Sequence, residues 1–321
     1  MGRLVDRVLA IVIGVEQAAS DNVMVRLSEL AALAEACRTA FLAIGSTSNW
    51  EPASGSAGAR VREALATADP AVTSDGIAAG FELVQEVVVT YLEIAANDLA
   101  GLSALYRCNE AIFPPIPLIR SIIEHSAHAM WVIGADPQLS PTAILARAYL
   151  EEFASCESGK QAAVQMGDKT TTAYQGARTR WKSVRDRALK AFPDNNPTDL
   201  GVEGGRMLGG QRLLGPEAGV GWMFDLLERF RAVSVTRRQA EGIYAFLCAG
   251  THPSLYQARQ LRRRRELRKE LTSLERELKL AISAYYNALG YTMDFLGCDR
   301  APHEALTAAV EMCFPVGYWM E

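Results

Sequence analysis

The chain has 321 residues and a mass of 34.9 kDa, and 49% of its residues are hydrophobic. That composition excludes a largely disordered chain and is sufficient for one large core or two smaller ones. The formal net charge of -4 and the sequence pI near 5.7 exclude a polycation that coats nucleic acid non-specifically, so any nucleic-acid site must be local. The longest apolar run, Val8 to Val15, is shorter than the roughly 20 residues that span a bilayer. We therefore expect a cytoplasmic protein without a membrane-spanning helix.

The six cysteines also indicate a cytoplasmic protein. They are spread along the chain without any C-x-x-C pair, and most have apolar neighbours, which predicts buried reduced thiols and gives no support to a zinc finger. The six are Cys37, Cys108, Cys156, Cys248, Cys298 and Cys313.

Apolar residues recur at intervals of three and four residues along nearly the whole chain, and this spacing predicts helices. We expect an N-terminal helical extension over 1–44 with helices at about 3–16 and 22–44, a Gly/Ser linker over 45–58, and a main helical bundle over 59–321. The β-branched run at 87–89 lies inside a helix-length pattern and is assigned to a helix. The predicted helices of the bundle are 59–68, 77–105, 116–134, 141–166, 170–191, 222–233, 237–250 and 254–297.

Several boundaries have a local cause. Ser140 before Pro141 is typical of an N-cap followed by proline at the first helical position, and Thr236 with Gln239 fits a capping box. Residues 192–221 are predicted to be a long Gly-rich loop, which is neither a phosphate loop nor a dinucleotide fingerprint. The expected fold is therefore all-α: an elongated multi-helix bundle with a long Gly-rich loop and a long basic helix in its C-terminal half.

The densest group of polar side chains on an apolar helix lies within 116–131. Arg120, Glu124 and His128 follow one another at intervals of four, so they share one face and can pair in a row, and His125 lies beside that row. A buried arginine requires a carboxylate partner. These residues therefore fit either a structural Arg-Glu-His network or a reactive site.

The segment RSIIEH places Arg120 and His125 at the R-x-x-x-x-H spacing, and this resembles HEPN-type proteins, a helical superfamily rich in RNA-cleaving toxins and defence effectors. The resemblance implies a homodimer in which Arg120 stabilises the phosphate and His125 is the acid/base. A histidine accepts a proton near neutral pH and a guanidinium holds phosphate oxygens bidentately, so the implied chemistry is coherent. The residue after the arginine departs from the usual motif, because Ser121 stands there.

A second resemblance covers roughly residues 80–297. The helix from Arg120 to Trp131 with Asp136-Pro137, the helix that holds Arg147, and Tyr244 with His252-Pro253-Ser254 look like an uncharacterised family of all-helical bacterial proteins near the HEPN group. This resemblance implies a fold and a polar centre in which His252 faces Arg120 and Glu124. A histidine that only hydrogen-bonds a helix end is an equally good explanation of His252.

The segment 256–280 holds nine Lys/Arg and four Glu, and is therefore a local basic region. Its polarity suits a phosphate-binding face, in which Arg262, Arg263, Arg264 and Arg265 would hold RNA. However, an apolar seam runs through the same segment, so a solvated helix face is favoured and the seam itself is a candidate dimer interface. The seam consists of Leu267, Leu271, Leu274, Leu278, Ala281, Tyr285 and Ala288.

The leading functional hypothesis is a HEPN-like, metal-independent ribonuclease or toxin/defence-type effector that acts as a homodimer on RNA without a cofactor. Its catalytic candidates are Arg120, Glu124, His125 and His252, and its substrate-binding candidates are His128 with the four arginines of the basic segment. One alternative is a non-catalytic helical interaction or scaffold protein with a buried Arg-Glu-His network. A third is a metal-binding bundle enzyme using Glu124, His128 and His252 with Glu93 or Glu152, although no Glu-x-x-His occurs in the chain.

Overall fold

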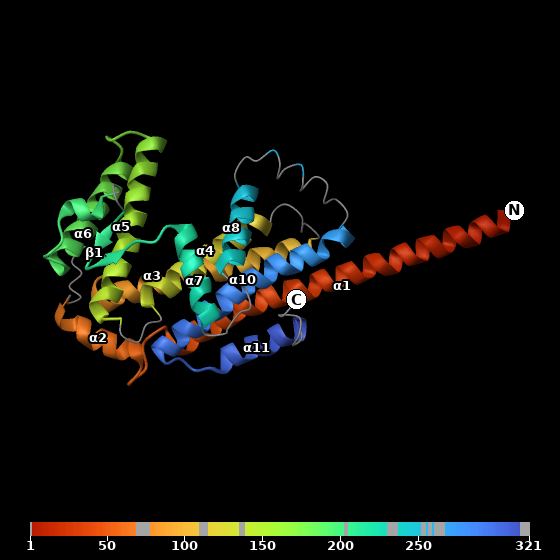
Figure 1. Ribbon diagram of the computed structural model, residues 1–321, viewed down its shortest axis with the longest axis horizontal. Helices are drawn as coiled ribbons and strands as arrows, with labels where there is room; N and C mark the ends of the chain where they lie inside the picture. The colour runs from red at the N-terminus through yellow and green to blue at the C-terminus, as the bar shows by residue number, and fades with distance from the viewer. Residues whose placement is uncertain are drawn as a thin grey trace.

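The computed structural model describes residues 2–68, 78–108, 115–134, 139–201, 205–229, 237–251, 255, 259 and 267–314. The fold is all-α, as the sequence pattern predicts, and within these residues one small sheet pairs β1 with β2 in antiparallel orientation (Figure 1). In chain order the elements are α1 Gly2–Ser48, α2 Ala57–Ala68, α3 Gly80–Arg107, α4 Pro115–Ile133, α5 Pro141–Met166, α6 Thr172–Ala191, a 3-10 turn at Pro197–Leu200, β1 Met207–Leu208, β2 Gln211–Arg212, α7 Pro216–Arg229, α8 Arg237–Thr251, α10 Leu267–Leu296 and α11 Ala301–Cys313.

The hydrophobic core forms where α1, α3, α4 and α10 pack along one another, with α4 against both α3 and α10. Leu92, Ile119 and Leu278 are fully buried there. Each such side chain contributes roughly 1.5–3 kcal/mol when it leaves water. α5 and α6 rise from this body as a separate antiparallel pair, and α7 and α8 pack on α4 (Figure 1).

The N-terminal region is one helix and not the two that the sequence predicts. α1 runs for 47 residues from Gly2 to Ser48, because the intervening residues 17–21 contain neither glycine nor proline to end it. It ends where Asn49 and Trp50 adopt positive φ angles of 49° and 58°. Within the predicted linker 45–58, the backbone N–H of Ala53 donates to the carbonyl of Leu296 at 2.8 Å, which ties this turn to the end of α10.

The predicted Gly-rich loop over 192–221 is more structured than expected. It contains the 3-10 turn and the β1–β2 hairpin, and α7 begins inside it at Pro216 rather than at residue 222. Gly209 and Gly210 have φ angles of +52° and +73°, the left-handed conformation that a two-residue type I′ hairpin turn requires at both central positions. These glycines therefore build a tight turn and not an open flap.

Local sequence signals explain the start of α5, whereas one helix, α11, was not predicted. Ser140 Oγ accepts a hydrogen bond from the N–H of Ala143 at 3.1 Å, which confirms the predicted N-cap of α5. The helix predicted over the 87–89 valine run is α3. α11 has a proline in its first turn. Thr236 lies outside the described residues.

The predicted seam of the basic helix faces the interior of its own chain. Leu274, Leu278, Ala281, Tyr285 and Ala288 on α10 are all 3% exposed or less, because they pack into the core. This part of the seam is consequently not available as a dimer interface.

Two further expectations concern the cysteines and membrane spans. All six cysteines are free, but Cys108 is exposed where α3 ends, and only Cys37 and Cys313 are buried. In the described part of the chain, α3 is long and apolar enough to cross a membrane. Here it packs against α1 and α4 in the core.

Candidate functional site

The polar face of α4 meets α8 through Arg120. The Nε of Arg120 donates to Glu124 Oε1 at 2.6 Å, and its Nη1 donates to Thr251 Oγ1 at 2.7 Å. The hydroxyl of Tyr244 donates to the same Glu124 oxygen at 2.7 Å, and the guanidinium lies 5.7 Å from the centre of the Tyr244 ring. The side chains of Arg120 and Glu124 are 21% and 22% exposed, so this network is largely enclosed.

Burial alone would lower the pKa of Arg120, but the hydrogen bond and charge of Glu124 outweigh it and raise that pKa. Burial together with the hydrogen bond to Glu124 raises the pKa of Tyr244. Arg120 therefore stays charged and Tyr244 stays a neutral donor. Glu124 accepts one hydrogen bond from Arg120 on its own helix and one from Tyr244 on α8.

His128 pairs with α5 instead of continuing the row from Arg120. Its Nδ1 lies 2.6 Å from Glu151 Oε1, and the hydroxyl of Tyr91 on α3 donates to Glu151 Oε2 at 2.8 Å. Burial lowers the pKa of His128, but the hydrogen bond and charge of Glu151, together with the charge of Glu124, raise it above 6.5 overall. His128 and Glu151 thus form a buried pair that joins α4, α5 and α3.

His125 faces α3 and is only half-buried. Its Nδ1 lies 2.7 Å from the backbone carbonyl of Ser121, and its ring centre is 5.5 Å from that of Tyr91. The Ser121 Oγ lies 3.1 Å from the same nitrogen, and because the closer carbonyl oxygen only accepts, the geometry assigns a proton to Nδ1. The other ring nitrogen has no hydrogen-bond partner among the described residues. Nε2 is therefore the ring nitrogen that faces no other described group.

The two residues of the R-x-x-x-x-H spacing diverge within one copy of the chain. Positions 120 and 125 are separated by about 140° around a helix, and Arg120 meets α8 whereas His125 meets α3. One copy therefore does not bring the guanidinium and the imidazole to a common point. His252, Arg262, Arg263, Arg264 and Arg265 lie outside the described residues, although Thr251, which precedes His252, contacts Arg120.

The carboxylates proposed for a metal site are dispersed. Glu93 is exposed on α3, and Glu152 accepts from Arg180 of α6 at 2.8 Å. Across the described ranges, His, Cys, Asp and Glu side chains form no group of three or more that could hold a metal ion.

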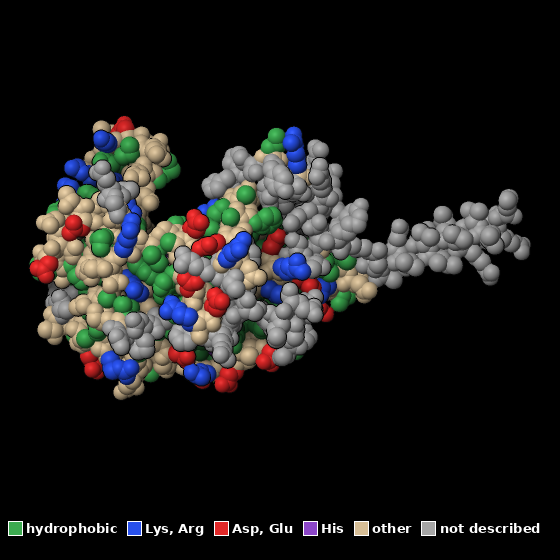
Figure 2. Space-filling view, in the orientation of Figure 1, with side chains coloured by type: hydrophobic (Ala, Val, Ile, Leu, Met, Phe, Trp, Pro, Cys, Tyr) green, Lys and Arg blue, Asp and Glu red, His purple; other side chains and the backbone are tan. Residues whose placement is uncertain are grey.

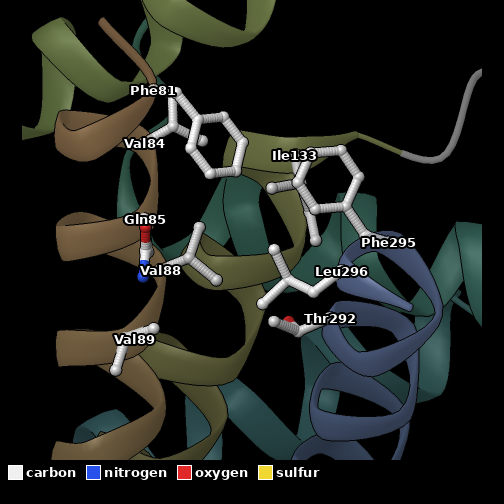
Figure 3. Close-up of a pocket in the computed structure, with 9 residues that line it drawn as sticks. All are labelled: Phe81, Val84, Gln85, Val88, Val89, Ile133, Thr292, Phe295 and Leu296. Atoms are coloured by element: carbon white, nitrogen blue, oxygen red, sulfur yellow. The ribbon is translucent and has the colours of Figure 1, made fainter. Parts of the chain in front are cut away.

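Two cavities lie away from this face. The first, of about 10 Å³, has room for about one water-sized sphere and is lined almost entirely by apolar side chains of α3, α4 and α10 (Figure 3), so it is a packing gap in the core. The second, of about 280 Å³, lies between α10 and α11. His303 lies in it, with its ring centre 4.2 Å from that of Tyr286 and its Nε2 3.1 Å from the Tyr286 carbonyl.

The sequence did not reveal three residues that complete the polar network, Tyr91, Glu151 and Thr251. The second resemblance named Tyr244 but not its contact with Glu124. The one available signal in the sequence was Glu151, a carboxylate that interrupts an apolar face of the helix. In the structure this residue is 5% exposed. Tyr91 and Thr251 are tolerated on any helix surface and acquire their partners through packing.

The fold places this chain among all-α helical proteins. No family model, curated protein or solved structure matches it.

Proposed function

We propose that the chain is a HEPN-like, metal-independent ribonuclease or toxin/defence-type effector that acts as a homodimer, with His125 as its acid/base. The observation that carries this proposal is the 2.7 Å contact between His125 Nδ1 and the Ser121 carbonyl oxygen. The Nδ1–H of His125 is fixed on that carbonyl and its Nε2 lone pair is left for a ribose 2′-hydroxyl. Arg120 supplies the cation for the phosphate, and Glu124 orients it.

The divergence of Arg120 and His125 within one copy is the reason for proposing a homodimer. A second copy would place its own Arg120 near the first copy's His125, so that one phosphodiester meets both groups. His252 and the arginines Arg262, Arg263, Arg264 and Arg265 belong to the same proposal as a further catalytic candidate and as RNA ligands, and His128 holds the helix that carries the site.

The test is cleavage of a labelled single-stranded RNA by purified protein in the presence of a chelator. We expect His125→Gln to lower the cleavage rate by about 10²–10⁴-fold, the usual contribution of a general base. Ser126→Ala on the adjacent position serves as the matched control and should cleave at the wild-type rate. A folded His125→Gln protein that cleaves as fast as wild type would refute the proposal.

A second candidate is a non-catalytic interaction or scaffold protein. The observation that favours it is that Glu124 and Thr251 satisfy Arg120 inside the fold. In that case Arg120→Ala should lower the free energy of unfolding by about 1–3 kcal/mol, because Glu124 keeps its burial but loses a charged donor. Denaturant unfolding measures this loss, and wild-type protein with no RNA cleavage at any concentration would favour this candidate.

A further inference from the structure

The strongest positive charge in the described part of the chain lies on α6, away from the α4 face. Residues 172–191 contain six Lys/Arg and one acidic residue, Asp186, for a net charge of +5 in a chain whose total is -4. Figure 2 shows Lys and Arg side chains gathered on the lobe that α5 and α6 form. A solvated helix usually alternates charges of both signs, and α6 does not.

Some of this charge is neutralised by α5. Arg180 pairs with Glu152 at 2.8 Å, on the side of α6 that faces α5. The outward side keeps its charge: Arg178 and Lys182 are exposed and form no ion pair among the described residues. Arg185, one turn further, pairs only with its exposed neighbour Asp186. We call Lys160, Arg178, Lys182 and Arg185 the α6 cation patch.

The α6 cation patch is spatially compact. Arg178, Lys182 and Arg185 follow one another at intervals of four and three, so they share one face along about 10 Å of helix. Lys160 of α5 joins them, because its Nζ lies 3.5 Å from the centre of the Trp181 ring and the Arg185 guanidinium lies 5.1 Å from the same ring. Glu157 on α5 partly offsets the charge of Lys160, since its Oε1 lies 3.9 Å from Nζ.

The cations of this patch repel one another. Burial and the charges of Arg185 and Arg178 together lower the pKa of Lys160, although the charge of Glu157 opposes them. An anion placed on the patch would relieve this repulsion. Trp181 is already covered by cations, so the patch offers charge rather than an open ring on which a base could stack.

We propose that the α6 cation patch binds the sugar-phosphate backbone of single-stranded RNA without regard to base sequence. This inference rests on the proposed function, for which it supplies the surface that holds the substrate. Glu151, which pairs with His128, lies nine residues before Lys160 on α5, or about 14 Å along that helix. A bound strand on α6 therefore lies close enough to extend toward the α4 face.

The test compares two triple variants of the full chain with the same loss of charge. The first is Arg178→Gln/Lys182→Gln/Arg185→Gln, and the matched control is Arg38→Gln/Arg60→Gln/Arg62→Gln on α1 and α2. Fluorescence anisotropy of labelled oligouridine and oligoadenosine RNA is measured over a range of salt, with circular dichroism melting to show that each variant is folded.

Wild type should bind oligouridine and oligoadenosine with similar affinity, and the control variant should bind each RNA as tightly as wild type does. The patch variant should bind at least ten-fold more weakly, and the slope of log K against log salt should fall in magnitude by about 2, since each phosphate contact to a single strand contributes about 0.7. Equal RNA affinity and slope for the patch variant and wild type would overturn the inference. Wild-type binding to anionic vesicles without binding to RNA would also overturn it.

His125→Gln separates this inference from the ribonuclease proposal. RNA binding that depends on the patch, with no cleavage by wild type, would support the RNA surface and refute the nuclease. Cleavage that depends on His125 and is unchanged in rate and KM by the patch variant would support the nuclease and refute the RNA surface.

Discussion

At the scale of single residues, His128 and Glu151 are a hydrogen-bonded pair inside the bundle, with side chains 14% and 6% exposed, and they form an ion pair when His128 is protonated. A buried pair of this kind costs desolvation, which good geometry and further hydrogen bonds must offset. Tyr91 provides such a bond to the second Glu151 oxygen. The group therefore fixes how α4 meets α3 and α5, and its contribution depends on the charge of His128.

The pH dependence of stability follows from the raised pKa of His128. A histidine whose pKa is higher in the folded protein stabilises the fold fully below its unfolded pKa, and that contribution is lost as pH rises through the folded pKa. We expect wild type to exceed His128→Gln in free energy of unfolding by about 1–3 kcal/mol at pH near 6, and by less as the pH rises above the folded pKa. Urea unfolding of both proteins across that range measures the difference. A gap that stays constant or widens with pH would show that His128 is not charged in the fold.

At the scale of elements, the β1–β2 hairpin depends on its glycines. A Cβ on Gly209 would lie 2.7 Å from the ring of Phe192, at a φ angle of +52° that other residues rarely adopt. Gly176 in α6 differs on both counts, since a Cβ there meets nothing within 4 Å. The two positions therefore predict opposite effects of the same substitution.

We expect Gly209→Ala to lower the free energy of unfolding by about 1–3 kcal/mol, because the cost of the strained φ angle and the cost of the close contact with Phe192 add together. Gly176→Ala should raise it by about 0.5–1 kcal/mol through helix propensity. Thermal or denaturant unfolding of the two variants checks both signs. If Gly209→Ala were as stable as wild type, the hairpin would not have this turn.

At the scale of the whole molecule, the proposed homodimer needs a surface other than the part of the α10 seam from Leu274 to Ala288, which is buried. Figure 1 shows the N-terminal part of α1 projecting beyond the other drawn helices. In the sequence of this segment, positions 5, 8, 12 and 15 are all valine and recur at the intervals of one helix face. An apolar stripe of this kind is typical of helix pairing.

We expect Val12→Asp to dissociate the homodimer, since it places a charge at the centre of the stripe. Ala10→Asp is the matched control, because position 10 lies on the opposite side of the helix. Sedimentation equilibrium of the three full-length proteins measures the effect. A wild-type monomer would contradict the homodimer itself, and a dimer that survives Val12→Asp would show that it forms through another surface.

How much the sequence predicts depends on the range of each interaction. The contact of Arg120 with Glu124 follows from a spacing of four in one helix, and the N-cap at Ser140 follows from two adjacent residues. The partner of His128 does not follow in this way: spacing allows Glu124, but the structure gives Glu151, because α5 packs beside α4 and presents a buried carboxylate at 2.6 Å.

The sequence by itself determined that this protein is all-α, where most of its helices lie, and which helix carries its densest polar face. Periodicity and caps act within a few residues, so these features need no knowledge of the rest of the chain. Only the tertiary structure decided that α1 packs along α3 and α10, that the described part of the α10 seam is internal, and that Tyr244 and Thr251 meet the polar face of α4. Apolar burial drives packing without direction, so the residues that meet across helices are set by how the whole set of helices fits together.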